Sequence, residues 1–506
     1  MHRKDIVLSI LSGILLSLGF PKFSMFYLSW FALVPLLVAL RGKTPGNAFR
    51  LGFLCGLVHY ATTLHWIQYV VQHYGGLSSP LAIGCVLILA AYMALYPGVF
   101  GYVASRLESR TSLWVFGLPG TWVALEFIRA HVLTGFPWAN LGYTQTPWNL
   151  VIQFADITGV YGVSWLLVLA STVMAAFVMG RGRALYPVVF TVCLALALGY
   201  GSWRRAAVDE WQSKISPWPV AVIQGNIDQS VKWDPDFQQM TLERYDTLSR
   251  EAMEHQPQPR LLVWPETAVP FFYGLDENLT AQVNQTFSAV GKPVLFGVPS
   301  LIFVDGEAKL QNSALLVRHD GTLLGSYAKQ HLVPFGEYVP YQNVLFFVNR
   351  LVHAAGDFVP GRGPSLMEHD GHALGVLICY EGIFPRLARA ATRGGADILV
   401  NITNDAWYGD TGAPYQHMEM SLWRAVEFRV PLVRAANTGV SVIVDAKGQI
   451  LGRIPLNETG QLVAEIHPLQ KMTLYERWGD FFAWLCGLTS LVGVVYAKRR
   501  SANTLL

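Results

Sequence analysis

The chain has 506 residues, of which 52% are hydrophobic and only 14% are charged. Soluble globular proteins usually carry about 25% charged residues, so this deficit indicates a membrane protein. The formal net charge of +3 is too small to favour a nucleic-acid partner, and no block of like charges or arginine-rich arm suggests one.

Long apolar runs with few charges are confined to residues 5–201 and 480–497. A membrane-spanning helix needs about 20 mostly apolar residues, so these runs predict an α-helical membrane domain. We expect about eight spans, which place both termini on the same side of the membrane. The expected spans are Ile6–Phe20, Met25–Leu40, Ala48–Val71, Leu81–Val103, Leu113–Val132, Ile157–Met179, Leu185–Tyr200 and Phe481–Ala497.

The lysine and arginine residues between these spans orient the protein. Alternate short loops hold only Lys22 and, at the edge of the fifth span, Arg129. Loops rich in lysine and arginine face the cytoplasm, so both termini are expected there and residues 202–478 on the opposite face. The basic residues of the cytoplasmic loops are Arg3, Lys4, Arg41, Lys43, Arg50, Arg106, Arg110, Arg181, Arg183, Lys498, Arg499 and Arg500.

The first apolar run has a second interpretation, because Arg3 and Lys4 followed by apolar residues would also suit a cleaved signal peptide. No small-residue cleavage motif follows, and further spans come at once. An uncleaved first span is therefore the favoured interpretation.

Residues 202–478 have the composition of an ordinary soluble domain and are numerous enough for one large core. We therefore expect a membrane domain of seven helices at 1–201, this extramembrane domain, and a C-terminal transmembrane helix with a tail at 479–506. Short apolar runs alternate with helical patterns in the extramembrane domain, which indicates an α/β or α+β fold. The expected strands are Pro219–Gln224, Arg260–Trp264, Pro293–Val298, Ala373–Cys379 and Ile398–Ile402, with hairpins formed by Ser313–Arg318 and Thr322–Tyr327 and by Val440–Asp445 and Ile450–Ile454.

The five cysteines are unevenly placed. Cys55, Cys85, Cys193 and Cys486 fall inside expected spans, and Cys379 alone belongs to the extramembrane domain. In an oxidising compartment Cys379 has no disulfide partner within its domain. A solitary cysteine of this kind is either a buried small hydrophobe or a nucleophile, and the count alone does not decide between them.

A carboxylate and a lysine lie at the ends of predicted strands. Glu266 follows the run Val263-Trp264-Pro265, where it could act as a general base or simply be an acid at a helix N-terminus. Lys329 ends the first predicted hairpin, where it could hold a developing oxyanion. Glu337 could hold this lysine or share protons with Glu266, and the alternative for the whole segment is a surface salt bridge.

Cys379 lies where the apolar run Gly375–Ile378 gives way to a polar turn. A nucleophile is commonly presented at such a strand-to-helix elbow, with the next backbone N–H free to bind an oxyanion. The motif Cys-Tyr-Glu by itself is only moderately specific.

Glu266, Lys329 and Cys379 together are far more specific than any one of them, and their order resembles the Glu-Lys-Cys arrangement of the nitrilase superfamily. The whole chain is also similar to the apolipoprotein N-acyltransferases of Gram-negative bacteria, over nearly all of its 506 residues. The further segments that carry this resemblance are Gly19-Phe20-Pro21, Gly135-Phe136-Pro137-Trp138, Leu141-Gly142-Tyr143, Gln224-Gly225-Asn226, Lys232-Trp233 and Asn401-Ile402-Thr403-Asn404-Asp405-Ala406-Trp407.

The resemblance implies a four-layer α-β-β-α nitrilase-type sandwich that faces the periplasm, joined to an eight-helix domain in the bacterial inner (cytoplasmic) membrane. It implies a catalytic triad of Glu266, Lys329 and Cys379. Around the triad it implies that Glu337 and Glu381 support the catalytic groups and that Trp233 and Tyr380 shape the pocket.

The activity implied by the resemblance is the final acyl transfer of lipoprotein maturation. A phospholipid, phosphatidylethanolamine, would donate an acyl chain to Cys379 as a thioester, and the α-amine of a diacylglyceryl apolipoprotein would accept it with ping-pong kinetics. No cofactor and no metal are expected. His59, His65 and His73 lie around the third expected span, where helix packing or interfacial contacts are favoured over metal coordination.

Two other functions fit parts of the pattern. A membrane-tethered nitrilase-type amidase would use the same three residues with water as the acceptor, but one span would suffice as its tether. A transporter with a soluble receptor domain is disfavoured, because few ionisable residues lie within the expected spans. The segment Val344–Ala355 is too short to span and is expected to be an interfacial arm, a lid or an ordinary core helix.

Overall fold

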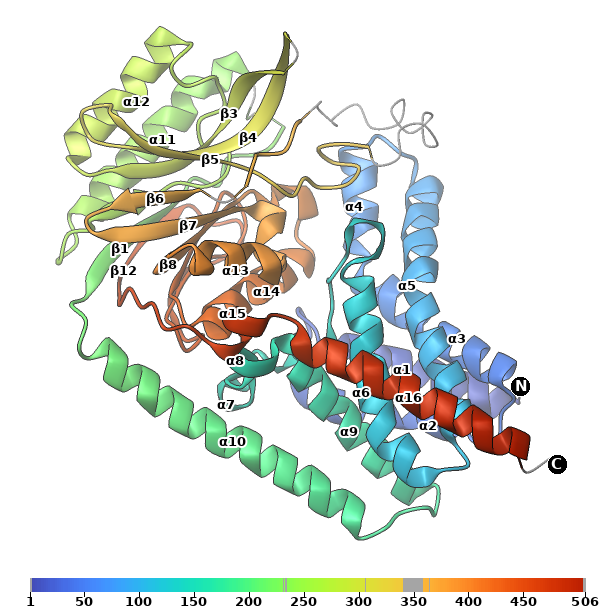
Figure 1. Ribbon diagram of the computed structural model, residues 1–506. Coiled ribbons are helices and arrows are strands. Elements are labelled where there is room, and N and C mark those ends of the chain that lie inside the picture. The colour runs from blue at the N-terminus through green and yellow to red at the C-terminus, as the bar shows by residue number, and fades with distance from the viewer. Residues whose placement is uncertain are drawn as a thin grey trace. The chain divides into compact units, whose positions relative to one another are not determined.

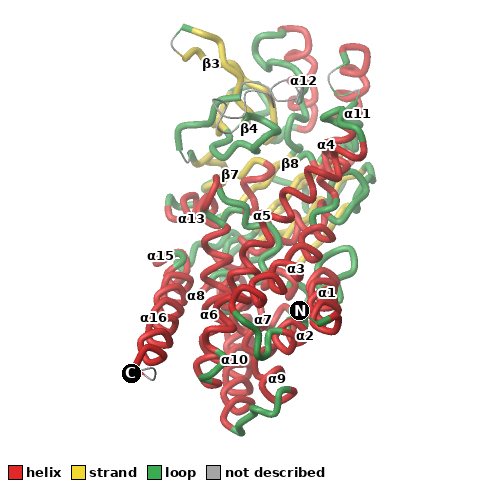
Figure 2. The backbone as a smooth tube through the Cα atoms, turned by 90° about the vertical axis from the view of Figure 1, so that its right-hand side faces the viewer, coloured by secondary structure: helices red, strands yellow, loops and turns green. Residues whose placement is uncertain are grey.

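The computed structural model describes residues 2–230, 232, 234–304, 306–339, 358–363 and 365–503, with the backbone alone after residue 496. Trp233 and the segment Val344–Ala355 therefore lie outside the described residues. The chain forms two compact units (Figures 1 and 2). The first contains Met1–Gln68, Ser78–Ala206 and Arg477–Leu506, and the second contains Tyr69–Leu77 and Ala207–Glu476.

The first unit is built from helices. Among the described residues, four helices are long and apolar enough to cross a membrane: α5, α6, α9 and α10. The helices that begin in this unit are α1 (Arg3–Leu18), α2 (Val34–Ala39), α3 (Pro45–Thr63), α4 (Trp66–His73), α5 (Ser79–Leu107), α6 (Thr111–Arg129), α7 (Asn149–Ile152), α8 (Ala155–Thr158), α9 (Val160–Val178), α10 (Leu185–Gln212) and α16 (Phe481–Asn503), with 3₁₀ helices η1 (Phe26–Trp30), η2 (Val132–Thr134) and η3 (Leu141–Gln145).

Glycines allow α3 and α5 to approach closely. A side chain on Gly52 of α3 would collide with the backbone carbonyl of Pro97, and one on Gly101 of α5 would collide with that of Ala48. Small residues at helix contacts are typical of membrane helices, because the backbones can then come into van der Waals contact.

Three of the expected spans, the second, the third and the sixth, are not continuous helices; the sixth is interrupted at Gly159, which has φ +62° and lies between α8 and α9. The second divides into η1 and α2, because Pro35 is fixed at the first turn of a helix and lacks the N–H that an unbroken helix would need. The third ends at Thr63, and α4 begins at Trp66. The Nδ1 of His65 hydrogen-bonds the carbonyl of Thr62 over 2.8 Å, which competes with helix continuation there.

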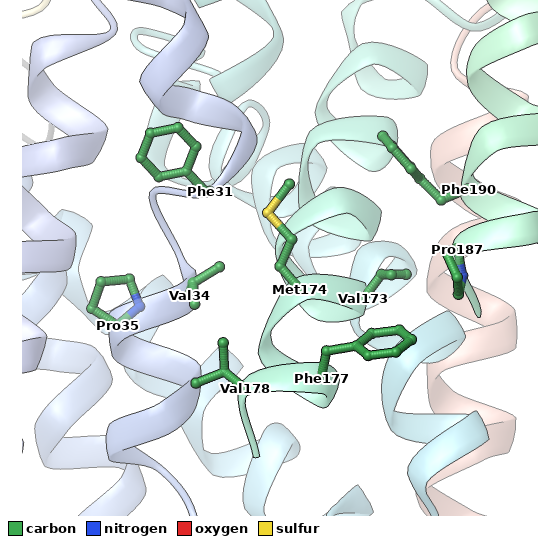
Figure 3. A pocket seen from close by; sticks show the side chains of 9 residues that line it. All are labelled: Phe31, Val34, Pro35, Val173, Met174, Phe177, Val178, Pro187 and Phe190. Atoms are coloured by element: carbon green, nitrogen blue, oxygen red, sulfur yellow. The ribbon is translucent and has the colours of Figure 1, made fainter. Parts of the chain in front are cut away.

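An apolar pocket of about 630 Å³ lies in the first unit, lined by side chains of the segment around α2 and of α9 and α10 (Figure 3). Its lining is Phe31, Val34, Pro35, Val173, Met174, Phe177, Val178, Pro187 and Phe190. None of these side chains can act as an acid, a base or a nucleophile, so the reactive site must lie elsewhere in the chain.

The second unit contains two six-stranded sheets, with strand orders β12-β1-β2-β3-β4-β5 and β11-β10-β9-β8-β7-β6. Its helices are α11 (Pro235–Met253), α12 (Glu277–Val290), α13 (Pro385–Arg393) and α14 (Ala413–Phe428), with 3₁₀ helices η5 (Cys379–Ile383) and η6 (Asp405–Tyr408), and the short helix α15 (Leu474–Trp478) follows. The strands are β1 (Trp218–Gln224), β2 (Leu261–Val263), β3 (Val294–Val304), β4 (Glu307–Val317), β5 (Leu323–Ala328), β6 (Leu366–His369), β7 (His372–Ile378), β8 (Ile398–Thr403), β9 (Leu432–Ala436), β10 (Ser441–Val444), β11 (Ile450–Ile454) and β12 (Gly460–Ile466).

The alternation of side chains along the strands produces four layers. In β1, Val220 and Val222 belong to the core between the two sheets, whereas Ala221 and Ile223 face the core beneath α11 and α12. The helices α13 and α14 lie beside the second sheet (Figure 1). The α/β fold expected from the sequence is therefore confirmed as an α-β-β-α sandwich.

The second unit also includes Tyr69–Leu77, which contains the end of α4 and the turn after it and contacts η6. The hydroxyl of Tyr74 donates to the carbonyl of Ala406 over 3.1 Å, and its ring meets that of Trp407 edge-on at 4.6 Å. This segment therefore buttresses the loop that follows β8.

Candidate active site

The three residues singled out in the sequence lie at strand ends in the second unit. Glu266 follows β2, Lys329 directly follows β5, and Cys379 directly follows β7. Gly297 of β3 lets the Glu266 turn approach the sheet, since a Cβ atom there would lie 2.6 Å from the Cα of Glu266. Two of these residues follow strands of one sheet and Cys379 follows a strand of the other.

Lys329 lies between two carboxylates. Its Nζ is 2.9 Å from Glu337 Oε1 and 3.7 Å from Glu266 Oε1, and its side chain is only 1% exposed. Burial alone would lower the pKa of Lys329, but Glu337 and Glu266 together raise it above its usual range. The lysine is therefore a fixed positive charge in a site closed to bulk water.

Asn312 of β4 joins the same two carboxylates, and sequence patterns did not point to it. Its Nδ2 donates to Glu266 Oε1 over 2.7 Å and to Glu337 Oε1 over 3.0 Å. The other oxygen of Glu266, Oε2, accepts the backbone N–H of Asn404 over 2.8 Å. These bonds hold the Glu266 carboxylate in one orientation, as a general base requires.

Cys379 occupies the left-handed region of backbone conformation, with φ +53°. This conformation costs an L-residue roughly 1–2 kcal/mol, so neighbouring contacts must hold it. Burial, with a further contribution from Glu266, raises the pKa of the Cys379 thiol, and Lys329 only partly opposes this. The resting thiol is therefore protonated at neutral pH and needs a base when it reacts.

Glu381 ties the end of β7 to the end of β5. Its carboxylate accepts the backbone N–H groups of Ile378 over 2.7 Å, Gln330 over 2.7 Å and His331 over 3.0 Å. The hydroxyl of Tyr327 donates to both of its oxygens over 3.0 Å. Because Gln330 follows Lys329 and Ile378 precedes Cys379, this one buried carboxylate fixes the lysine and the thiol relative to each other.

Tyr380 is buried beside two aromatic rings. It meets Phe384 edge-on at 4.9 Å and stacks on His331 at 5.8 Å. Burial, with a further contribution from Arg386, lowers the pKa of His331 to about 4. The neutral imidazole can then accept a hydrogen bond at Nδ1 from Arg386 Nη2 over 2.8 Å.

A second buried lysine, Lys232, also lies at the site. Its Nζ donates to the backbone carbonyl of Glu266 over 3.1 Å, and burial lowers the pKa of the amine to about 8. The sequence marked Lys232 only as part of a resembling segment and gave it no role.

Each of the two units contains a region that matches a known protein family. The family model described as "Apolipoprotein N-acyltransferase N-terminal domain" matches residues 12–173, and the model "Carbon-nitrogen hydrolase" matches residues 219–473. An apolipoprotein N-acyltransferase of Geobacter metallireducens is 44% identical over 99% of this chain and 96% of its own length. The chain belongs to the apolipoprotein N-acyltransferase family. A member from Methylococcus capsulatus is 34% identical over 98% of this chain and 97% of its own length.

Membership in the apolipoprotein N-acyltransferase family confirms the resemblance drawn from the sequence and makes the chain a membrane acyltransferase of the nitrilase superfamily. Glu266, Lys329 and Cys379 all lie within the carbon-nitrogen hydrolase match. Among solved structures, the match to an amidase from Nesterenkonia sp. covers 52% of this chain and 94% of the amidase chain, with 23% sequence identity and a TM-score of 0.39.

Proposed function

We propose that this protein transfers an acyl chain from a phospholipid, through a thioester on Cys379, to the α-amine of the N-terminal diacylglyceryl cysteine of an apolipoprotein. The observation that carries the proposal is the convergence of a buried thiol, an oriented carboxylate and a lysine held between carboxylates in one buried site. Such a set suits acyl transfer, in which a proton leaves the nucleophile as an oxyanion forms.

In the first half-reaction, Glu266 takes the proton of the Cys379 thiol while the sulfur attacks the ester carbonyl of the phospholipid. Lys329 and backbone N–H groups after Cys379 stabilise the tetrahedral oxyanion. The carbon–oxygen bond of the ester then breaks, and Glu266 returns the proton to the departing lysophospholipid oxygen. The acyl chain remains on Cys379 as a thioester.

In the second half-reaction, the α-amine of the acceptor attacks the thioester. An α-amine has a pKa near 8, so a fraction of it is unprotonated at neutral pH. Glu266 takes a proton from the attacking nitrogen and returns it to the Cys379 sulfur as the amide forms. Glu337 and Glu381 hold Lys329 and Cys379 in place for both half-reactions, and the family resemblance supports a role for Tyr380 and Trp233 in shaping the substrate site.

Both substrates are lipids, which accounts for an acyltransferase attached to membrane helices. We propose eight membrane segments, with helices in 1–201 and 479–506, in the bacterial inner membrane. The catalytic domain, 202–478, then faces the periplasm, where phosphatidylethanolamine serves as acyl donor. The lysine and arginine residues between the spans support this orientation.

The chemistry is tested with the purified full-length protein and phosphatidylethanolamine vesicles. We expect an acyl mass on the peptide that contains Cys379, with lysophospholipid released first and little free fatty acid. A diacylglyceryl peptide with a free N-terminus should discharge this mass, and the same peptide with an acetylated N-terminus should not. Fatty-acid release without an acceptor, at the rate of transfer, would instead indicate a membrane-tethered hydrolase.

Substitutions at Cys379 and Glu266 test the roles of the nucleophile and the base. Cys379→Ala should form no acyl-enzyme, and Cys379→Ser should be severely impaired, because a carboxylate base is poorly matched to a hydroxyl. Glu266→Gln should slow thioester formation by about two orders of magnitude while phospholipid still binds. Normal turnover in Cys379→Ala would refute the thioester route.

Orientation is tested with cysteines at exposed positions on the two sides. Glu307→Cys, in the extramembrane domain, should react with an impermeant maleimide in intact spheroplasts. Arg183→Cys, in the loop before α10, should react only after lysis. The reverse pattern would overturn the periplasmic assignment.

A further inference from the structure

A cluster of fully buried polar side chains lies behind Cys379, formed by Asn401 of β8, Asp405 of η6, His417 of α14 and Arg434 of β9. Arg434 Nη2 is 2.7 Å from Asp405 Oδ2, and its Nη1 donates to Asn401 Oδ1. Gly439 leaves room for the Asp405 carboxylate, because a side chain there would collide with it. The four residues come from four different elements, so the cluster is assembled only when the domain folds.

The imidazole of His417 connects this cluster to the backbone of Cys379. Its Nε2 is 3.1 Å from the Cys379 carbonyl oxygen, and its Nδ1 is 2.9 Å from Asp405 Oδ1. A carbonyl oxygen can only accept, so Nε2 must carry a proton in this arrangement. Asn401 Nδ2 approaches the same carbonyl at 3.4 Å, which is a longer and weaker contact.

Asp405 and Arg434 fix which way the His417 ring points. Burial would raise the pKa of Asp405, but Arg434 and His417 together lower it to about 2, so the carboxylate stays ionised. Arg434 Nη2 also lies 3.2 Å from His417 Nδ1. The ring edge that carries Nδ1 is thus held by charged partners, which leaves Nε2 directed at the Cys379 carbonyl.

The hydrogen bond from His417 Nε2 is made to the carbonyl of Cys379, the residue whose backbone is strained. Cys379 has φ +53°, and its carbonyl begins the turn that leads into Tyr380. The Cys379 carbonyl and the Tyr380 N–H belong to one planar peptide unit, so rotating that peptide turns the N–H relative to the thiol on the preceding Cα. A donor fixed at this carbonyl therefore holds the N–H in one direction relative to the thiol, which acyl transfer requires.

We propose that His417 is a positioning residue for acyl transfer, which donates its Nε2–H to the Cys379 carbonyl and so holds the backbone conformation that presents the thiol and the oxyanion-binding N–H. The inference rests on the proposed thioester chemistry at Cys379. It assigns His417 no contact with substrate and no proton transfer to it.

Two substitutions distinguish the effect of losing the Nε2–H donor from the effect of losing side-chain volume at position 417. In His417→Gln, the amide nitrogen can reach the place of Nε2 and donate to the Cys379 carbonyl. In His417→Asn, the shorter amide reaches only the place of Nδ1 near Asp405. A control on the same helix is Glu427→Gln, which perturbs a buried ion pair 2.9 Å from Arg424 and keeps the Cys379 contact.

The test measures the rate at which Cys379 of the full-length protein gains an acyl mass from two donors, p-nitrophenyl butyrate and phosphatidylethanolamine vesicles. Loss of positioning should lower the maximal acylation rate of His417→Asn by about tenfold or more with little change in KM. His417→Gln should stay within about threefold of the wild type. Glu427→Gln should lose thermal stability without a change in the acylation rate of the folded protein.

The outcomes separate this inference from the proposed function. Wild-type acylation rates in His417→Asn, or equal losses in the Gln and Asn variants, would overturn the positioning role. Loading of the wild type by the nitrophenyl ester but not by phospholipid would refute the proposed substrate, while the difference between the Gln and Asn variants would still decide the role of His417. Absence of any acyl mass on wild-type Cys379 would refute both.

Discussion

Replacing Lys329 with methionine keeps most of the aliphatic stem and removes the positive charge between Glu266 and Glu337. The lysine is 1% exposed and lies 2.9 Å from one carboxylate and 3.7 Å from the other. Removing one partner of a buried ion pair typically costs about 3–5 kcal/mol, because the remaining charge is left without compensation. We expect Lys329→Met to lose stability on this scale.

The loss should depend on pH. Without the lysine, the two carboxylates that share Asn312 repel each other, so the folded variant should take up a proton that the unfolded chain does not hold. A folded state that binds more protons becomes less stable as the pH rises. The deficit of Lys329→Met relative to the wild type should therefore be larger at pH 8 than at pH 5.

The same substitution should slow acylation. Removing one oxyanion-stabilising donor costs about 10²–10³-fold in rate, or about 2.7–4 kcal/mol. The assay follows the acyl mass on Cys379 in detergent, with thermal unfolding measured on the same sample. Lys309→Met is the control, since Lys309 pairs with the exposed Glu307 and the change should leave acylation unaltered. Acylation of Lys329→Met within tenfold of the wild-type rate would refute the oxyanion role.

Three further predictions follow from individual groups. Because burial raises the pKa of the Cys379 thiol, its alkylation by iodoacetamide should accelerate with pH up to about 10 without a plateau, and a plateau below pH 9 would contradict this. His331 has its pKa lowered to about 4, below an unfolded value near 6.5, so the folded state binds fewer protons between these values and stability should rise with pH across that window; His331→Gln should flatten this dependence in thermal unfolding, and an unchanged slope would exclude His331 as its source. The Glu381 carboxylate accepts from three backbone N–H groups and from the Tyr327 hydroxyl, so Glu381→Gln should cost about 2–3 kcal/mol by setting an amide N–H against one of these donors, and a wild-type melting temperature would refute this prediction.

The three residues that sequence reasoning assigned to catalysis, Glu266, Lys329 and Cys379, share one property, which is that each follows the end of a predicted strand. An uninterrupted apolar run such as that before Cys379 predicts a buried strand, and the first polar residue after it must lie at the sheet edge. The sequence could therefore place Glu266, Lys329 and Cys379 at strand ends before any geometry was known. The predicted strands indicated an α/β or α+β fold, and the nitrilase-type sandwich was implied by the family resemblance.

Residues inside regular elements were not predicted, because periodicity describes them as ordinary positions. Asn312 lies within β4 and His417 within α14, and only the crossing of separate elements brings them to Glu266 and Cys379. The breaks in the second and third expected spans were missed for a related reason. A hydropathy average over a window of residues does not register Pro35 or the contact of His65 with the Thr62 carbonyl, because each affects only one backbone hydrogen-bonding group.

The charge states at the site bear on why one set of residues can serve two acyl transfers. The resting thiol of Cys379 is protonated, and Lys329 stays charged between its carboxylates. If the resting sulfur were a thiolate, the proton of the attacking amine would need another acceptor, whereas a thiol that reacts through Glu266 recovers its proton from that amine. In the proposed scheme, Glu266 is deprotonated both before the ester enters and before the amine enters. The two half-reactions then begin from the same ionisation of Glu266 and Lys329, and only the occupant of the Cys379 sulfur differs.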